Sequence, residues 1–89
     1  MSAIKHVSSA LALGRIIRDR RKSLGLTQAA AGRLVGVHQT TLSDVERGKN
    51  KVKIDTLMKL IAALRLELLI QPIPSFSDQW QKDWENNGA

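Results

Sequence analysis

Four polar side chains lie close together in a stretch where a solvent-facing helix usually carries long charged residues. They are Gln39, Thr40, Ser43 and Asp44, within the segment HQTTLSDVERGK. A glutamine amide can pair with adenine through two hydrogen bonds, a threonine can contact a base edge, and a carboxylate can accept a hydrogen bond from cytosine. These residue types predict a helix that reads base edges in the major groove of DNA.

Residues suited to phosphate contacts surround this stretch. A glutamine at the start of a helix can present its amide, beside free backbone N–H groups, to a phosphate oxygen. The predicted phosphate contacts are Gln28, His38, Arg47, Lys49, Lys51 and, if the first helix passes near the DNA, Arg18. We expect them to set the affinity and its salt dependence rather than the choice of sequence.

Four helices are needed to position these side chains, and the sequence marks their ends. The first begins after a hydroxyl cap at Ser8 or Ser9 and ends near Leu24, before a glycine suited to a left-handed turn. The second begins after the cap Thr27 and ends before Gly36, which permits a sharp turn. The expected helices cover residues 9–24, 28–35, 38–47 and 54–64.

Apolar residues recur at intervals of three and four, which predicts one buried face for each helix. Gly32 lies within the second helix, where glycine costs about 1 kcal/mol relative to alanine, and we expect it to admit a closely crossing helix. The predicted inward residues are Leu13, Ile16, Ile17, Arg21, Leu24, Ala31, Val35, Val37, Leu42, Val45, Ile54, Leu57, Leu60, Ile61 and Leu64.

Two charged residues lie on these buried faces. Glu46 follows Leu42 by four positions and Arg21 follows Ile17 by four, so both point inward. Charges in an aliphatic interior need a partner. We therefore expect an Arg21–Glu46 ion pair that supports the structure and takes no part in a reaction.

Residues 65–71 break the helical pattern. Leu66, Leu68 and Ile70 alternate along the segment, and a proline follows, which predicts one β-strand. A lone strand leaves its backbone groups unpaired, and the same strand from a second copy is the simplest partner. The alternative is a last helical turn followed by extended chain.

Residues 72–89 form an acidic tail with aromatic residues at four-residue spacing. Phe76, Trp80 and Trp84 would lie on one face of a short helix capped at Ser77. An exposed aromatic stripe indicates a binding partner or docking on the body of the protein. A frayed terminus is the alternative.

Charge is divided unevenly along the 89 residues. Residues 1–66 hold thirteen lysines and arginines against four acids, a net +9, whereas residues 67–89 hold one lysine against four acids, a net −3. A basic body favours a polyanion partner, and ordinary solubilising charge is the alternative.

Several other kinds of site find no support in the residues. Cysteine is absent, and neither His6 nor His38 has acidic neighbours at metal-ligand spacing. No nucleophile, base and orienting group form a trio, and no apolar run is long enough for a membrane span. We expect a cytoplasmic protein that is not an enzyme and needs neither metal nor cofactor.

The motifs LGRIIRDRRKSLGLTQ and IDTLMKLIAAL, with the two glycines and HQTTLSDVERGK between them, closely resemble the Cro/repressor (Xre) helix-turn-helix family over about residues 12–64. The resemblance implies a mostly α bundle of four or five helices, within a domain we place at residues 9–64. It also implies sequence-specific DNA binding by a dimer on a palindromic operator and a buried Arg21–Glu46 bridge. The family's usual reading positions match Gln39, Thr40 and Asp44.

The segment LELLIQP and the tryptophan-bearing tail are similar to HipB-type antitoxins. This resemblance implies a homodimer with an intersubunit two-stranded sheet, repression of its own operon, and binding of a HipA-type Ser/Thr kinase toxin. The tail departs from that pattern by its second tryptophan, Trp80, and by five residues after Trp84. Two alternatives stay open: a stand-alone regulator, such as a phage repressor or restriction–modification controller, and a protein-binding dimerisation module that does not read DNA.

Overall fold

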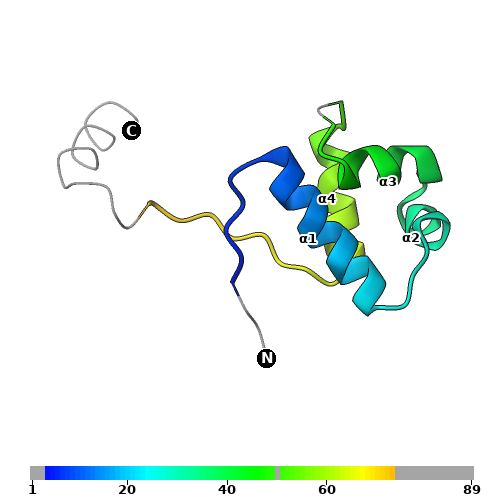
Figure 1. Ribbon diagram of the computed structural model, residues 1–89, viewed down its shortest axis with the longest axis horizontal. Coiled ribbons are helices and arrows are strands. Elements are labelled where there is room, and N and C mark those ends of the chain that lie inside the picture. Colours follow the sequence, from blue (N-terminus) through cyan, green and yellow to red (C-terminus); the bar gives the residue numbers. More distant parts are fainter. Residues whose placement is uncertain (1–3, 50, 74–89) are drawn as a thin grey trace.

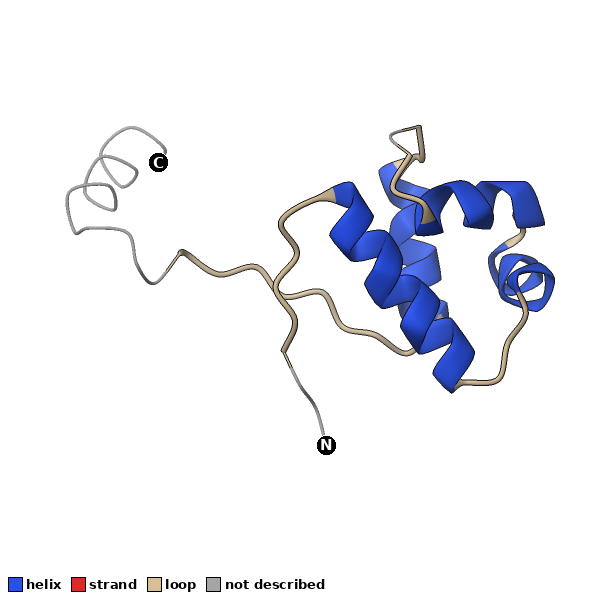
Figure 2. Ribbon diagram, in the orientation of Figure 1, coloured by secondary structure: helices blue, strands red, loops and turns tan. Residues whose placement is uncertain are grey.

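Four α-helices make up the regular structure of the chain (Figure 1). The computed structural model describes residues 4–49 and 51–73. The helices are α1 (Ala10–Ser23), α2 (Gln28–Val35), α3 (Gln39–Glu46) and α4 (Ile54–Ala63). Within the described residues all regular structure is helical (Figure 2), which confirms the predicted mostly α class.

The predicted helix ends are confirmed at the first two helices. The hydroxyl of Ser9 accepts a hydrogen bond of 3.0 Å from the backbone N–H of Ala12, and Thr27 caps α2 in the same way. Gly25 and Gly36 follow α1 and α2 with φ angles of 72° and 73°, the left-handed region that glycine occupies without strain. The two glycines therefore set the direction of the turns into α2 and α3.

The core is aliphatic, as predicted, and receives residues from all four helices. In Figure 1, α1 and α3 lie in front of α4, and α3 packs against both α1 and α2. The buried cluster consists of Ile17, Ala31, Leu42, Val45, Leu60 and Leu64. This core fixes the inner side of α3 and leaves its other side at the surface.

Two residues predicted to point inward are exposed instead. Ile54 is 75% exposed and Leu24 is 39% exposed. Ile54 is the first residue of α4 and Leu24 is the C-cap of α1. Helical periodicity assigned both to a buried face, but at a helix end the neighbouring helix need not extend far enough to cover it.

The prediction for Gly32 was wrong about which element approaches it. A Cβ built at Gly32 would lie 2.6 Å from the carbonyl oxygen of Val37, in the turn between α2 and α3, rather than against a crossing helix. The crossing helix meets Gly14, where a Cβ would lie 2.8 Å from the carbonyl oxygen of Glu46. Gly14 therefore allows α1 to pack directly on the end of α3.

The segment after α4 leaves the body as extended chain. Arg65 adopts a φ of 57°, and the N–H of Leu66 donates to the carbonyl of Ile61 at 3.0 Å, which closes the helix end. Arg20 donates to the carbonyl of Leu64 at 3.0 Å and ties this end to α1. The extended chain thus begins at residue 66, one residue later than predicted.

The predicted strand is not formed within one chain. No residue in 4–49 or 51–73 belongs to a β-strand, and Leu66 instead packs partly against the core. Leu68 and Ile70 are exposed. Pairing with a second copy stays a prediction, and so does the role of Phe76, Trp80 and Trp84, which lie outside the described residues.

Candidate nucleic-acid interface

The outer side of α3 presents the predicted reading residues. Gln39 and Thr40, in its first turn, are exposed, while Ser43 and Asp44 are half-buried one turn later. The opposite side of the helix buries Leu42, Val45 and Glu46. The two faces expected from the spacing are therefore present, with small polar groups outward.

The Arg21–Glu46 pair is formed and buried, as predicted. Nε of Arg21 donates to Oε2 of Glu46 at 2.6 Å, and Nη2 donates to Oε1 at 3.0 Å. Nη1 of Arg21 also donates to the carbonyl of Leu26 at 2.8 Å. The hydrogen bond to Glu46 raises the pKa of Arg21 above its usual value, so the guanidinium stays charged in any DNA-binding assay. Truncating either partner would leave a buried charge alone, at a cost of about 3–5 kcal/mol.

Gln28 links this pair to the reading helix. Its Nε2 donates to Oε1 of Glu46 at 3.1 Å, and its Oε1 accepts a hydrogen bond of 3.4 Å from Nε2 of Gln39. A chain of hydrogen bonds thus runs from Arg21 in the core to Gln39 at the surface. Sequence reasoning assigned Gln28 to phosphate contact alone and missed this connection. The available signal was that Gln28 and Gln39 each begin one of two helices joined by a tight turn.

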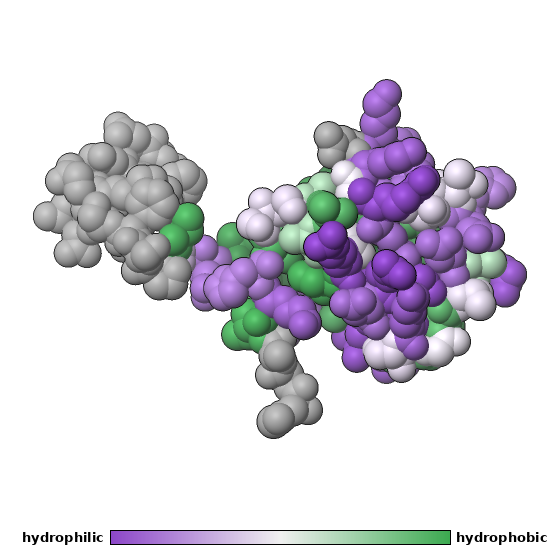
Figure 3. Space-filling model, in the orientation of Figure 1, coloured by the Kyte–Doolittle hydropathy of each residue, from purple (hydrophilic) through white to green (hydrophobic). Residues whose placement is uncertain are grey.

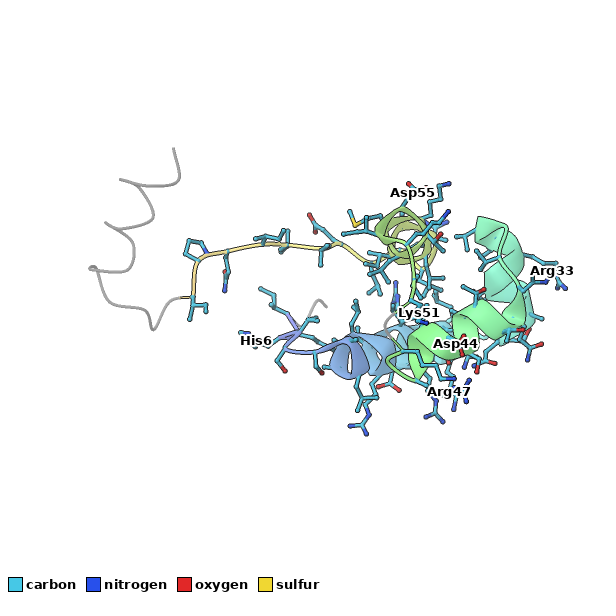
Figure 4. The ribbon with its side chains drawn as sticks, turned by 90° about the horizontal axis from the view of Figure 1, so that it is seen from above. His6, Arg33, Asp44, Arg47, Lys51 and Asp55 are labelled. Atoms are coloured by element: carbon cyan, nitrogen blue, oxygen red, sulfur yellow. The ribbon has the colours of Figure 1, made fainter. Side chains whose placement is uncertain are left out.

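Asp44 is held by two cations. Its Oδ1 lies 2.9 Å from Nη2 of Arg47 and 3.6 Å from Nζ of Lys49. The three side chains are between 36% and 60% exposed, so the pairs lie at the surface. Figure 4 shows Asp44 and Arg47 on the same side of the molecule, with Asp55 on the opposite side. The sequence did not predict these pairs.

A surface hollow of about 570 Å³ lies beside this cluster. Its lining consists of Thr41, Asp44, Gly48, Lys49, Lys51 and Val52. Two of the predicted phosphate contacts, Lys49 and Lys51, therefore line one hollow next to α3. His38 is the N-cap residue of α3 but makes no side-chain capping bond, and Arg18 is exposed on α1.

Polar and apolar surfaces are separated on the molecule. In Figure 3 the face formed by α1 and α3 is largely hydrophilic, and apolar surface gathers where the N-terminal segment and the segment after α4 leave the helical body. Exposed apolar residues at this end include Val7 of the N-terminal segment, Leu11 in the first turn of α1, and Leu68 and Leu69 after α4. Both segments leave at the end away from α2 (Figures 1 and 4). The hydrophilic face and the apolar end are therefore different surfaces.

Two other kinds of site are absent from the part of the chain that the structure describes. Residues 4–49 and 51–73 contain no group of three or more His, Cys, Asp or Glu side chains placed to hold a metal ion. In the same residues no helix combines the length and the apolar character required to cross a bilayer.

Comparison with known proteins places this geometry in a family. The model of a family described as helix-turn-helix (HTH_3) matches residues 17–70. An uncharacterised HTH-type transcriptional regulator from Haemophilus influenzae is 31% identical over 70 residues, covering 79% of this chain and 71% of that protein. The ImmF control region 10 kDa protein of Bacillus phage phi105 is 34% identical over 56 residues, covering 63% of this chain. The match spans 62% of the phage protein's length.

Solved structures share the fold. The restriction-modification controller C.AhdI from Aeromonas hydrophila matches with a TM-score of 0.60 and 31% identity, covering 65% of this chain and 84% of that one. The P22 c2 repressor, solved with a synthetic operator, matches with a TM-score of 0.58 and 38% identity. The match covers 62% of this chain and 83% of the repressor chain. A chain of the HipA-HipB-O2-O3 complex matches with a TM-score of 0.71 and 22% identity. The match covers 78% of this chain and 97% of that one. At 22% identity the last likeness concerns the fold alone.

Proposed function

Because the chain belongs to the helix-turn-helix family, we propose that it is a sequence-specific DNA-binding repressor whose helix α3 reads the major groove. The observation that carries this proposal is the outer side of α3. There Gln39, anchored through Gln28 to the buried ion pair, stands beside the exposed Thr40. A side chain whose rotamer is held before binding loses less entropy when it contacts a base.

Each polar group of α3 has a chemical counterpart on DNA. The Gln39 amide suits N6 and N7 of adenine, and Thr40 suits a base edge or a thymine methyl group. Ser43, one turn later, can donate or accept a hydrogen bond. Asp44 differs from these because one carboxylate oxygen is already paired with cations.

Phosphate contacts would come from the basic rim of the same face. Arg47, Lys49 and Lys51 supply charge near the end of α3, with His38 at its start and Arg18 on α1. Gln28 can also donate to a DNA phosphate, because Glu46 accepts only one of the two hydrogens of its amide group. These contacts act on any sequence and weaken as salt rises.

A homodimer on a palindromic operator would place two copies of α3 in successive major grooves. Support comes from residues 66–73, which extend away from the body and expose Leu68, Leu69 and Ile70. Pairing of residues 65–71 with the same segment of a second copy would give the backbone N–H and C=O groups hydrogen-bond partners. It would also cover these side chains. The pairing would also fix the half-site spacing.

The finer proposal is an antitoxin that represses its own operon and neutralises a HipA-type Ser/Thr kinase toxin. It is supported by the LELLIQP segment with the tryptophan-bearing tail and by a fold shared over nearly the whole HipB chain. A stand-alone regulator is the second candidate, favoured by the similarity to the phi105 protein and to C.AhdI. Co-purification with the product of the adjacent gene distinguishes the two, because only the antitoxin should retain a kinase-like protein.

The DNA-reading proposal is tested by titrating the protein against the DNA upstream of its own operon and against a scrambled duplex of equal length. Repeating both titrations at several salt concentrations separates phosphate contacts from base contacts. A repressor should prefer the upstream duplex at every salt concentration. Equal affinity for both duplexes would instead favour a dimerisation module that does not read DNA.

A further inference from the structure

The chain leaves α4 through a tight turn at residues 64–66, called here the exit turn. The N–H groups of Arg65 and Leu66 donate at 3.0 Å to carbonyls in the last turn of α4, and Leu66 packs against the core. This pair of hydrogen bonds is a Schellman motif, which usually has glycine at the position of Arg65. The exit turn sets the direction in which residues 66–73 leave the helical body (Figure 1).

Arg65 occupies an unfavourable backbone conformation in the exit turn. Its φ angle of 57° lies in the left-handed region, and within residues 4–49 and 51–73 every other residue with a positive φ is a glycine. The Cβ atom of an arginine makes this region costly. The preference of Arg65 itself therefore does not account for the turn, and contacts with the rest of the protein hold it in place.

Arg20 supplies a contact of this kind from another helix. Its Nε donates to the carbonyl of Leu64 at 3.0 Å. A carbonyl at a helix end has no partner within the helix, and a positive charge is favourable there. Arg20 is half-buried, whereas Arg15 and Arg18 on the same helix are exposed. The bond thus ties α1 to the residue at which the exit turn begins.

We propose that Arg20 is a positioning residue that holds the exit turn and thereby sets the half-site spacing that the dimer accepts on DNA. The proposal rests on the homodimeric DNA-binding function proposed above. In that dimer the two copies of α3 are connected through the paired segments 65–71, so a rotation at the exit turn moves one α3 relative to the other. Arg20 acts through this turn and needs no contact with DNA.

Half-site spacing is sensitive to the rigidity of this connection. One added base pair shifts a half-site by about 3.4 Å and turns it by about 35° around the DNA axis. A rigid dimer then cannot engage both half-sites, and it loses the gain of two-site binding, which is about 10²- to 10⁴-fold. A dimer whose exit turns can open keeps part of that gain at several spacings and loses part of it at the best one.

Arg20→Met is the test variant, because it removes the donor and keeps a long unbranched side chain. Lys59→Met is the matched control, because it also removes one positive charge, at an exposed residue of α4 that pairs with Asp55. A double variant, Arg20→Met with Arg65→Gly, places at the exit turn a residue that adopts a positive φ without strain. Thermal melting checks that each protein folds, and sedimentation gives its oligomeric state.

The DNA probes are the palindrome that the wild-type protein enriches from a random pool and versions whose spacer is shortened or lengthened by one or two base pairs. Fluorescence anisotropy gives the affinity of each protein for each duplex. If Arg20→Met melts below the assay temperature, Arg20→Lys takes its place, because it keeps the charge but lacks the fixed guanidinium donor.

The wild-type protein should prefer one spacing. Relative to the control, Arg20→Met should stay dimeric, bind the best-spaced duplex less tightly and bind the altered duplexes more tightly, so that the ratio falls by about tenfold or more. Lys59→Met should weaken binding to all duplexes by one common factor. The double variant should recover most of the preference, because its exit turn forms without help from Arg20.

Tighter binding to the altered duplexes is the result that supports the proposal most strongly, because a loss of stability or of charge can only weaken binding. Parallel spacing profiles for Arg20→Met and Lys59→Met would overturn the proposal and leave the dimer intact. A double variant as permissive as Arg20→Met would show that Arg20 does not act through the exit turn. A wild-type protein that sediments as a monomer or is indifferent to spacing would refute the homodimeric function itself.

Discussion

Replacing Gln28 by alanine should weaken DNA reading although Gln28 lies on α2 and not on the proposed reading helix α3. The substitution removes the 3.1 Å bond to the Glu46 carboxylate and the 3.4 Å bond that holds Gln39. A hydrogen bond to a charged group contributes about 1.5–3 kcal/mol to folding stability. Because Gln28 is only half-buried, we expect its loss to lower the free energy of unfolding by an amount near the lower limit of that range. The bond to Gln39 is longer and exposed, so its contribution should be about 0.5 kcal/mol.

A double-mutant cycle measures the second contribution. Gln28→Ala, Gln39→Ala and the double variant are titrated against the preferred duplex, with urea melts to record the stability of each. Gln39→Ala alone should cost about 1–3 kcal/mol of operator binding, and the double variant should cost about 0.5 kcal/mol less than the sum. Strict additivity would refute the idea that Gln28 positions Gln39.

Three further predictions concern other parts of the molecule. Gly14→Ala should destabilise the fold by about 1–3 kcal/mol in urea melts, because the new methyl group meets the carbonyl of Glu46; unchanged stability would mean that the two helices can separate freely. Lys49→Ala should weaken binding to all duplexes alike and reduce the salt slope by about 0.9; an unchanged slope would remove Lys49 from the phosphate contacts. Leu68→Arg should shift sedimentation toward the monomer, and an intact dimer would count against the proposed strand pairing.

Local signals predicted much of the fold. The caps Ser9 and Thr27 and the positive-φ glycines Gly25 and Gly36 depend on bonds within one turn, so residue type alone identifies them. The inward charge Arg21 followed from helical spacing, and its pairing followed from the cost of a lone buried charge. The caps and turns are set by residues close in the sequence. The ion pair is set by the need of a buried charge for a partner, and Glu46 is the acid predicted to point inward.

Features that depend on how helices cross were missed or misassigned. Gly14 could not be distinguished from Gly32 as the crossing glycine, because periodicity does not say which helix passes over which position. The bond from Gln28 to Gln39 depends on the angle between α2 and α3, which no local pattern records. The Asp44–Lys49 pair likewise requires the loop after α3 to return beside the helix. The Asp44–Arg47 pair joins residues three apart, a spacing that could have indicated it from the sequence. For the segment at 65–71, the predicted partner is another chain, so one chain cannot form the strand.

Selection of binding sites from a random duplex pool tests the central claim most directly. Wild-type protein should enrich a palindrome whose two half-sites lie about one helical turn apart, because two copies of α3 would enter successive major grooves. Gln39→Ala should select the same palindrome with one position relaxed in each half-site. A pool that shows no enrichment, or an enriched site that Gln39→Ala leaves unchanged, would contradict the conclusion that α3 reads DNA through this residue.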